Sequence, residues 1–181
     1  MEYLNKISNL QDYTISNAAE YFEMVIYSLV CFLIPIMLSH PQLVVGVVVN
    51  CMLITAALNL KGYKLLPVII LPVVGALTAG MLFGPFTIYL LYLMPFIWIG
   101  NAILVYVFKW LKLGLKKNYL FTLVVGAGLK SGFLFLSAFV LFKLGFIPVM
   151  FLTAMGIFQL GTALAGGVAA YLVHEAKKRI V

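Results

Sequence analysis

Four strongly polar side chains interrupt the long apolar runs of this 181-residue chain: Asn50, Asn101, Lys130 and Gln159. Lys130 is the most demanding, because it stands near the middle of Leu120 to Phe142, a stretch long enough to cross a bilayer as a helix. A charge at that depth costs several kcal/mol unless something offsets it. The lysine therefore pairs with an acid, faces a hydrated cavity, binds an anionic ligand or gives up its proton.

The depth of these four side chains can be counted along their own apolar segments. At the helical rise of ~1.5 Å per residue, all four lie within roughly 12 to 18 Å of the cytoplasmic edge. Each would cost free energy against lipid, so we expect them to point into a helical bundle. There they form either a hydrogen-bonded network that fixes helix packing or the floor of a binding site, and for Lys130 both interpretations stay open.

The acids near the membrane do not share this level. Glu20 and Glu23 lie at the start of the first apolar segment and Glu175 lies after the last, about 10 Å or more from the level of Lys130. A lysine can extend part of that distance, so a pair with Glu23 is one alternative. Otherwise we expect the two acids at the start of the first helix to interact with its dipole, and a role in proton coupling or ligand binding is the alternative.

Several kinds of catalytic or metal site have no sequence signal. The chain has no G-x-S-x-G, no H-E-x-x-H and no intramembrane aspartate pair. Cys31 and Cys51 are isolated within apolar segments, and His40 and His174 have no metal or triad partner. We therefore expect no catalytic residue, no metal, no cofactor and no enzymatic activity.

Composition identifies the chain as an integral membrane protein. Hydrophobic residues make up 65% and charged residues only 9%, against about 25% charged in soluble domains, and the mean hydropathy is +1.15. Six apolar segments predict an all-α bundle of six transmembrane helices: Ala18–Leu38, Gln42–Leu60, Leu65–Phe83, Phe86–Lys109, Tyr119–Phe142 and Pro148–Tyr171. This divides the chain into a polar N-terminal segment (1–17), a transmembrane domain (18–174) and a basic tail (175–181). Asn17 is the expected cap of the first helix.

The basic residues predict the orientation. With a cytoplasmic N-terminus, the only outer cation is Lys143, and the inner segments hold Lys6, Lys61, Lys64, Lys109, Lys112, Lys116, Lys117, Lys177, Lys178 and Arg179. This asymmetry predicts both termini in the cytoplasm, in a cell membrane of bacterial type. Although the formal charge is +7, the cations lie between apolar runs, so the expected partner is the lipid bilayer and not nucleic acid.

Small residues recur four apart in three segments: Ala76-xxx-Gly80-xxx-Gly84, Gly128-xxx-Gly132, and Thr162-xxx-Gly166 beside Ala163-xxx-Gly167. Each series makes a groove on one helix face. Such grooves pack an internal neighbour or dock a partner's helix, and internal packing is the commoner use.

The passage LLPVIILPVVGALTAGMLFGPFTIYLLYLMPFIWIGNAILVYVF resembles the substrate-binding S-components of energy-coupling factor transporters. In that family a helix rich in small residues leads into a Gly-Pro turn, here Gly80, Gly84 and Pro85, followed by another long helix. The resemblance implies a pocket for a vitamin or metal ion that opens to the outside, a membrane coupling protein and a pair of cytoplasmic ATPases. S-components often dock the coupling protein through an Ala-xxx-Ala pattern in the first helix, which AAEYFEMVIYSLVCFLIPIML lacks.

The chain is also similar to small Firmicutes membrane proteins that are sometimes labelled "iron hydrogenase". Iron-sulfur clusters are typically held by four cysteines each, and this chain has two. The label therefore carries no expected chemistry.

Together these patterns predict a non-enzymatic, membrane-embedded solute-binding protein, an S-component-like subunit of a micronutrient uptake transporter. The expected substrate-binding residues are Lys130, Asn101, Asn50 and Gln159, with Trp98 and Tyr92 as apolar walls. The alternative is a structural or interaction protein whose polar layer only fixes helix packing.

Overall fold

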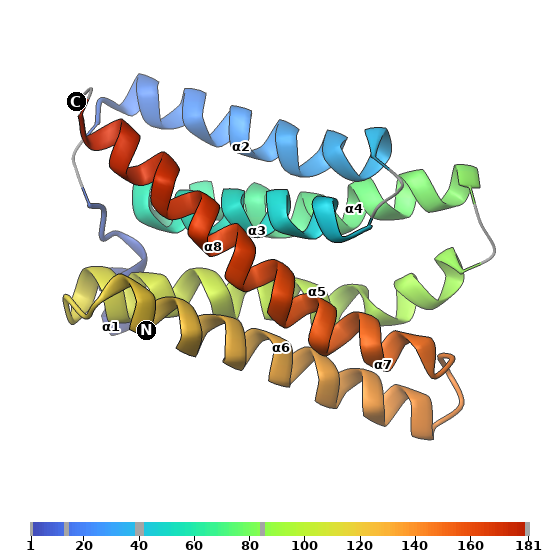
Figure 1. The fold of residues 1–181 in the computed structure, drawn as a ribbon. Helices are drawn as coiled ribbons and strands as arrows, with labels where there is room; N and C mark the ends of the chain where they lie inside the picture. The colour runs from blue at the N-terminus through green and yellow to red at the C-terminus, as the bar shows by residue number, and fades with distance from the viewer. Residues whose placement is uncertain (1, 13–14, 39–41, 84–85, 180–181) are drawn as a thin grey trace.

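The computed structural model describes residues 2–12, 15–38, 42–83 and 86–179, and every regular element within these ranges is helical. The predicted all-α fold is confirmed. The long helices lie side by side along one direction, while the last of them crosses the others obliquely (Figure 1). In chain order they are α2 (Asn17–Met37), α3 (Gln42–Asn59), α4 (Leu65–Phe83), α5 (Thr87–Val107), α6 (Tyr119–Lys143) and α8 (Ile157–Lys178).

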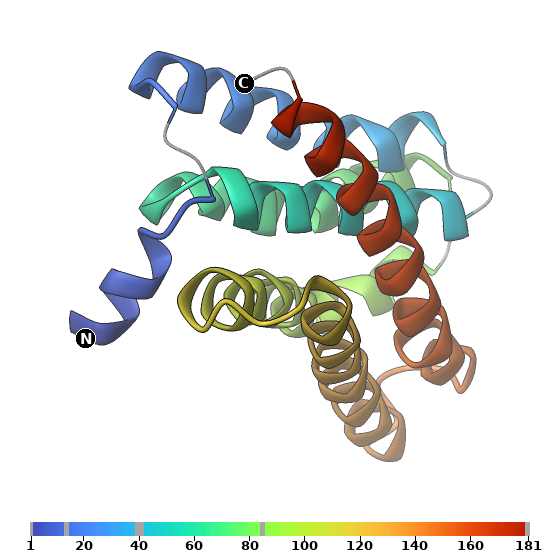
Figure 2. The same ribbon diagram turned by 60° about the vertical axis from the view of Figure 1, so that its left-hand side comes forward.

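Among the residues that the structure describes, five helices are long and apolar enough to cross a membrane, and α3 is shorter, with an apolar part of Leu43–Asn59. This short helix is the centre of the bundle: it packs against α2, α4, α5 and α8. Figure 2 shows it between α2 on one side and α5 and α6 on the other. Its side chains from Leu53 to Leu58 are almost wholly buried. Because α3 is enclosed by protein, little of its surface needs to match lipid.

The predicted segments agree with the helices except at their ends. The third segment has the bounds of α4, but α5 continues past Val107 as a π-helical stretch, η2 (Phe108–Gly114). The predicted sixth span is two helices, α7 (Met150–Met155) and α8, joined at Gly156. Short helices also form where none was predicted, namely α1 (Glu2–Ser8) and the 3-10 turn η1 (Gly62–Lys64).

The cap of α2 is Ser16, so the prediction of Asn17 is wrong. Ser16 is extended, and its hydroxyl accepts a 3.3 Å hydrogen bond from the Ala19 amide. Asn17 is the first residue of the helix and therefore follows the N-cap position. The predicted Gly84-Pro85 turn lies outside the described residues.

Two glycines mark places where helix backbones meet. A Cβ on Gly75 of α4 would lie 2.2 Å from the carbonyl oxygen of Phe32 on α2. A Cβ on Gly166 of α8 would lie 2.6 Å from the carbonyl oxygen of Val47 on α3. The Thr162-xxx-Gly166 groove is therefore used for internal packing, as expected for small residues in membrane helices. The face of α6 that carries Gly128 is open, with nothing within 4 Å of an added Cβ.

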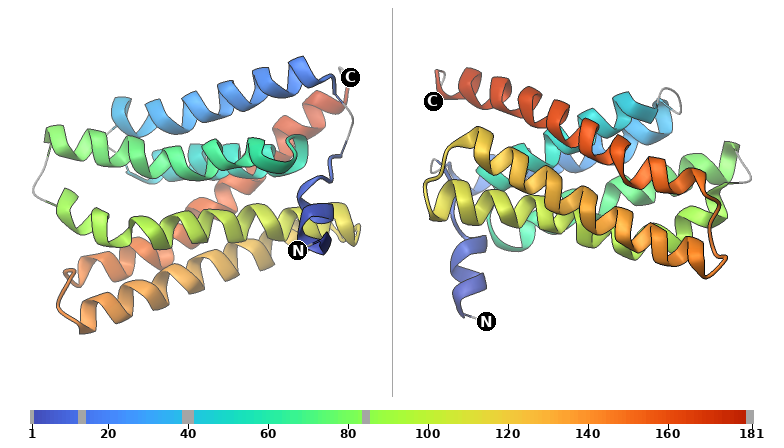
Figure 3. Two further views of the ribbon diagram at one scale, coloured as in Figure 1. Left: turned by 180° about the vertical axis from the view of Figure 1, so that it is seen from behind. Right: turned by 60° about the horizontal axis from the view of Figure 1, so that its bottom comes forward.

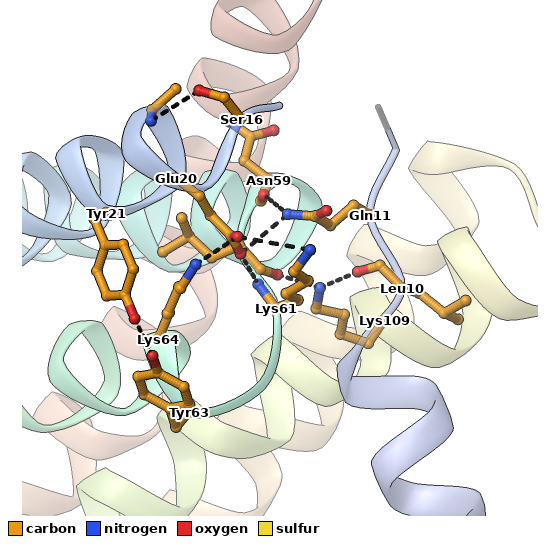
Figure 4. A network of polar contacts seen from close by, with 12 residues as sticks. Leu10, Gln11, Ser16, Glu20, Tyr21, Asn59, Lys61, Tyr63, Lys64 and Lys109 are labelled. Atoms are coloured by element: carbon orange, nitrogen blue, oxygen red, sulfur yellow. Dashed lines mark hydrogen bonds and ion pairs between the residues drawn. The ribbon is translucent and has the colours of Figure 1, made fainter. Parts of the chain in front are cut away.

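A buried carboxylate organises one end of the bundle (Figure 4). Glu20 on α2 is 0% exposed, and its Oε2 lies 2.6 Å from Nζ of Lys64, which is also buried. Its Oε1 accepts hydrogen bonds from the Lys61 amide at 2.8 Å and from Gln11 Nε2 at 3.1 Å. Interaction with the dipole of α2 is therefore not its main role: Glu20 joins α2 to the start of α4.

The polar N-terminal segment packs against the bundle and is not a separate unit. The Asp12 amide donates to the carbonyl of Leu58 at 3.0 Å. Nζ of Lys109, a fully buried side chain at the start of η2, donates to the carbonyls of Leu10 and Leu60. Residues 10–12 are thus held between the end of α3 and the end of α5.

The end of α8 reaches the same place, and Figure 3 shows both chain ends at one end of the bundle. Lys177 pairs with Glu23, while Asp12 Oδ2 lies 2.7 Å from His174 Nε2 and 3.5 Å from Lys178 Nζ. The predicted basic tail therefore begins inside α8, which continues to Lys178.

Candidate functional site

Lys130, Asn50 and Asn101 meet at the centre of the bundle, as their shared depth predicted. They come from α6, α3 and α5, and each is at most 2% exposed. Nζ of Lys130 donates to Oδ1 of Asn50 at 2.6 Å and to Oδ1 of Asn101 at 2.9 Å. One lysine side chain therefore links three helices.

Both amides are held with their oxygens toward the lysine. Nδ2 of Asn101 donates to the carbonyl of Ile69 on α4 at 3.0 Å. Nδ2 of Asn50 donates to the carbonyl of Gly46 at 2.9 Å and to the hydroxyl of Thr162 on α8 at 3.2 Å. Since each amide nitrogen has its own acceptor, Oδ1 is the group left for Nζ.

No carboxylate neutralises Lys130 among the acids whose side chains the structure describes. Glu20 and Glu23 pair with Lys64 and Lys177, and Asp12 and Glu175 lie against the end of α8. The alternative pair between Lys130 and Glu23 is therefore wrong. The amide oxygens supply dipoles but no net charge, so a protonated Lys130 leaves a positive charge in the protein interior.

A cavity of about 170 Å³ lies directly beside this group. The residues that line it lie in the halves of the helices that are farthest from the two chain ends. The lining residues are Pro35, Leu43, Val45, Gly46, Val49, Asn50, Pro72, Val73, Ala76, Leu90, Ile97, Asn101, Lys130, Ala154, Met155, Phe158, Gln159 and Thr162. Apart from the polar residues at its base, the wall is apolar.

Gln159 lines the cavity together with the other three predicted residues. Within the described part of the chain, no hydrogen bond joins its side-chain amide to Lys130, Asn50 or Asn101. Thr162, one helical turn further along α8, also lines the cavity and does bond Asn50. The sequence analysis considered Thr162 only as a small residue. Its position three residues after Gln159 was the signal that would have placed both on one helix face.

The two predicted aromatic wall residues, Trp98 and Tyr92, are not among the residues that line the cavity. Nε1 of Trp98 donates to the carbonyl of Ile70 at 3.1 Å, and Tyr92 is 43% exposed with its ring against Phe146. Helical phase explains the difference: Leu90 and Ile97, seven residues apart, share the cavity face of α5, and residues 92 and 98 point elsewhere.

Replacing Trp98 by phenylalanine tests this placement. Loss of the hydrogen bond to Ile70 is expected to lower the free energy of unfolding by about 1 kcal/mol. Binding of any solute in the cavity should stay unchanged, because Trp98 is not on its wall. Thermal unfolding in detergent and a binding assay on the same sample measure both effects. A large loss of binding would show that Trp98 does contribute to the binding site.

No protein-family model matches this chain, and no curated protein or solved structure matches it either.

Proposed function

We propose that the protein is a membrane-embedded solute-binding subunit of an uptake transporter, similar in role to an S-component, with Lys130 at the base of its binding site. One observation carries the proposal: a buried lysine without a counter-charge among the described residues forms part of the wall of a cavity. An intramembrane ionisable residue in such a place generally marks a substrate or ion path.

In this proposal α2 to α6 and the α7–α8 pair make six spans, and both termini are cytoplasmic. The basic segments then lie on the inner side, in agreement with the distribution of lysines. The cavity lies in the outer half, so the solute enters from outside. Release inward requires the helices to rearrange, and a coupling protein with cytoplasmic ATPases is the proposed source of energy.

Two variants test the site. Lys130→Met and Asn101→Leu are expected to reduce solute binding by about tenfold or more, since each removes part of a charge-assisted hydrogen-bond arrangement. The measurement is native mass spectrometry of gently extracted protein, which is expected to show a bound small molecule in the wild type. Uptake of that molecule by cells is the second measurement.

Lys143→Met is the matched control. Lys143 is exposed at the end of α6 and lies over the ring of Phe139, so its loss removes one lysine of the same helix without touching the cavity. Unchanged binding and uptake in both site variants would show that the proposed site is wrong.

A structural role is the second candidate, and the network itself favours it. Both asparagine amides bond to protein groups, so the layer can fix the register of five helices, α3, α4, α5, α6 and α8, without a ligand. In that case Lys130→Met would lower the unfolding temperature in detergent, and no uptake would change.

A further inference from the structure

We propose that the solute is a small, largely apolar compound with a single carboxylate, bound with that carboxylate on Lys130. The inference rests on the proposed function and adds to it a charge, a size and an orientation.

The charge follows from the burial of Lys130 and from the lack of a carboxylate beside it among the acids whose side chains are described. In its protonated form Lys130 has three N–H donors, and two of them are taken by Asn50 and Asn101. The third is available to an acceptor in the cavity. A neutral carbonyl would accept this hydrogen bond but leave the buried charge in place, whereas an anion neutralises it. An anion is therefore the occupant that the site favours.

The charge and the donors of the wall select the kind of anion. Asn50 Nδ2 donates to Gly46 and Thr162, the Thr162 hydroxyl donates to the carbonyl of Gln159, and Asn101 Nδ2 donates once, to Ile69. The donors left on the wall are Lys130 Nζ, the second N–H of Asn101 and the side-chain amide of Gln159, and Lys130 is the one cation among the lining residues. A carboxylate carries one charge and matches this single cation, while a phosphate brings up to two charges. The residues that line the cavity include no acid, so a second, cationic group on the solute would have no partner there.

The size follows from the volume. The cavity measures about 170 Å³, and an apolar protein cavity of about 150 Å³ holds one benzene molecule. A single ring or a short branched chain bearing one carboxylate therefore fits. Its apolar part would lie against the aliphatic and aromatic wall formed by side chains such as Val73, Ile97 and Phe158.

The test compares matched probes on the purified full-length protein in lipid nanodiscs. Benzoate and benzamide have the same ring and nearly the same shape, and only benzoate is charged. Benzoate is expected to bind about tenfold more tightly than benzamide by calorimetry, since its hydrogen bond to the lysine is between charged groups. Cyclohexanecarboxylate and its methyl ester form a second pair with the same expected order.

Variants tie the preference to the site. Lys130→Met should abolish the preference for benzoate, and Lys130→Arg, which keeps the charge, should retain part of it. Gln159→Leu should reduce the preference and leave the Lys130 network intact. Lys143→Met should bind as the wild type does. Ala154→Leu, which fills part of the cavity, should weaken both probes equally.

Three outcomes overturn the inference: benzoate binding no tighter than benzamide, no detectable binding of either probe, or an unchanged preference in a folded Lys130→Met protein. The proposed solute-binding function is tested independently of the carboxylate. A neutral solute that co-purifies with the wild type and is lost from the Lys130→Met protein would refute the carboxylate and leave the solute-binding function standing.

Discussion

Gly75→Ala is expected to lower the free energy of unfolding by about 3 kcal/mol, the upper part of the range for overpacked cores. The added Cβ would lie 2.2 Å from the carbonyl oxygen of Phe32, and this obstacle is backbone and not a flexible side chain. Helices α2 and α4 must therefore separate along the interface that they share. Unfolding in mixed detergent micelles, with increasing amounts of a denaturing detergent, measures the loss.

The same substitution at Gly128 is the control. Gly128 is in the interior of α6 and nothing lies within 4 Å of its added Cβ, so alanine should be neutral or stabilise the helix by up to about 1 kcal/mol. Equal effects of the two substitutions would contradict the close approach of α2 and α4. A large loss at Gly128 alone would instead show that this open face of α6 packs against another protein.

Glu20→Gln is expected to lower the free energy of unfolding by about 4 kcal/mol, because it leaves the buried ammonium of Lys64 without its counter-charge. The Glu20 side chain is 0% exposed and that of Lys64 is 5% exposed, at an N···O distance of 2.6 Å. Glutamine preserves the shape of the side chain but replaces one accepting oxygen by an NH2 group, so the loss reports the charge together with one accepted hydrogen bond. Thermal unfolding in detergent is the measurement.

Glu175→Gln is the matched control, since Glu175 has a side chain 43% exposed and lies 3.9 Å from Lys178. An exposed pair of this kind contributes about 0.5 kcal/mol. Adding Lys64→Met to Glu20→Gln should restore most of the lost stability, because it removes the unpaired charge. A Glu20→Gln protein as stable as the control variant would mean that the pair is hydrated and not buried.

The gathering of the polar layer could be predicted because depth depends only on the constant rise of a helix. Asn50, Asn101 and Lys130 interrupt their apolar segments at one level, and the structure joins them through Nζ of Lys130. A residue must also lie on the side of its helix that faces the site, and depth along the helix does not determine that side. This is why Trp98 and Tyr92 were expected on the wall and Thr162 was missed.

The end that holds both chain termini could not be predicted from local pattern. Residues 10–12 (Leu-Gln-Asp) are too few to show an amphipathic period, and they are held by groups far along the chain, such as Leu58 and Lys109. Glu20 likewise satisfies the ordinary rule for an acid in a first helical turn, so its position along the chain did not indicate Lys64 as a partner. Contacts of this kind depend on which helix ends meet, and that is a property of the whole bundle.

The two hydrogen bonds of Lys109 can form only late in the synthesis of the N-terminal part of the chain. Its partners lie 99 and 49 residues earlier in the chain, at Leu10 and Leu60. At roughly 5 to 20 residues per second, the ribosome needs about 5 to 20 s to travel from the first of these partners to the lysine. During that interval α2, α3 and α4 are synthesised, while the carbonyls of Leu10 and Leu60 still lack Nζ of Lys109 as a donor. The contacts by which Lys109 holds residues 10–12 against the bundle can therefore form only after these three helices have been made.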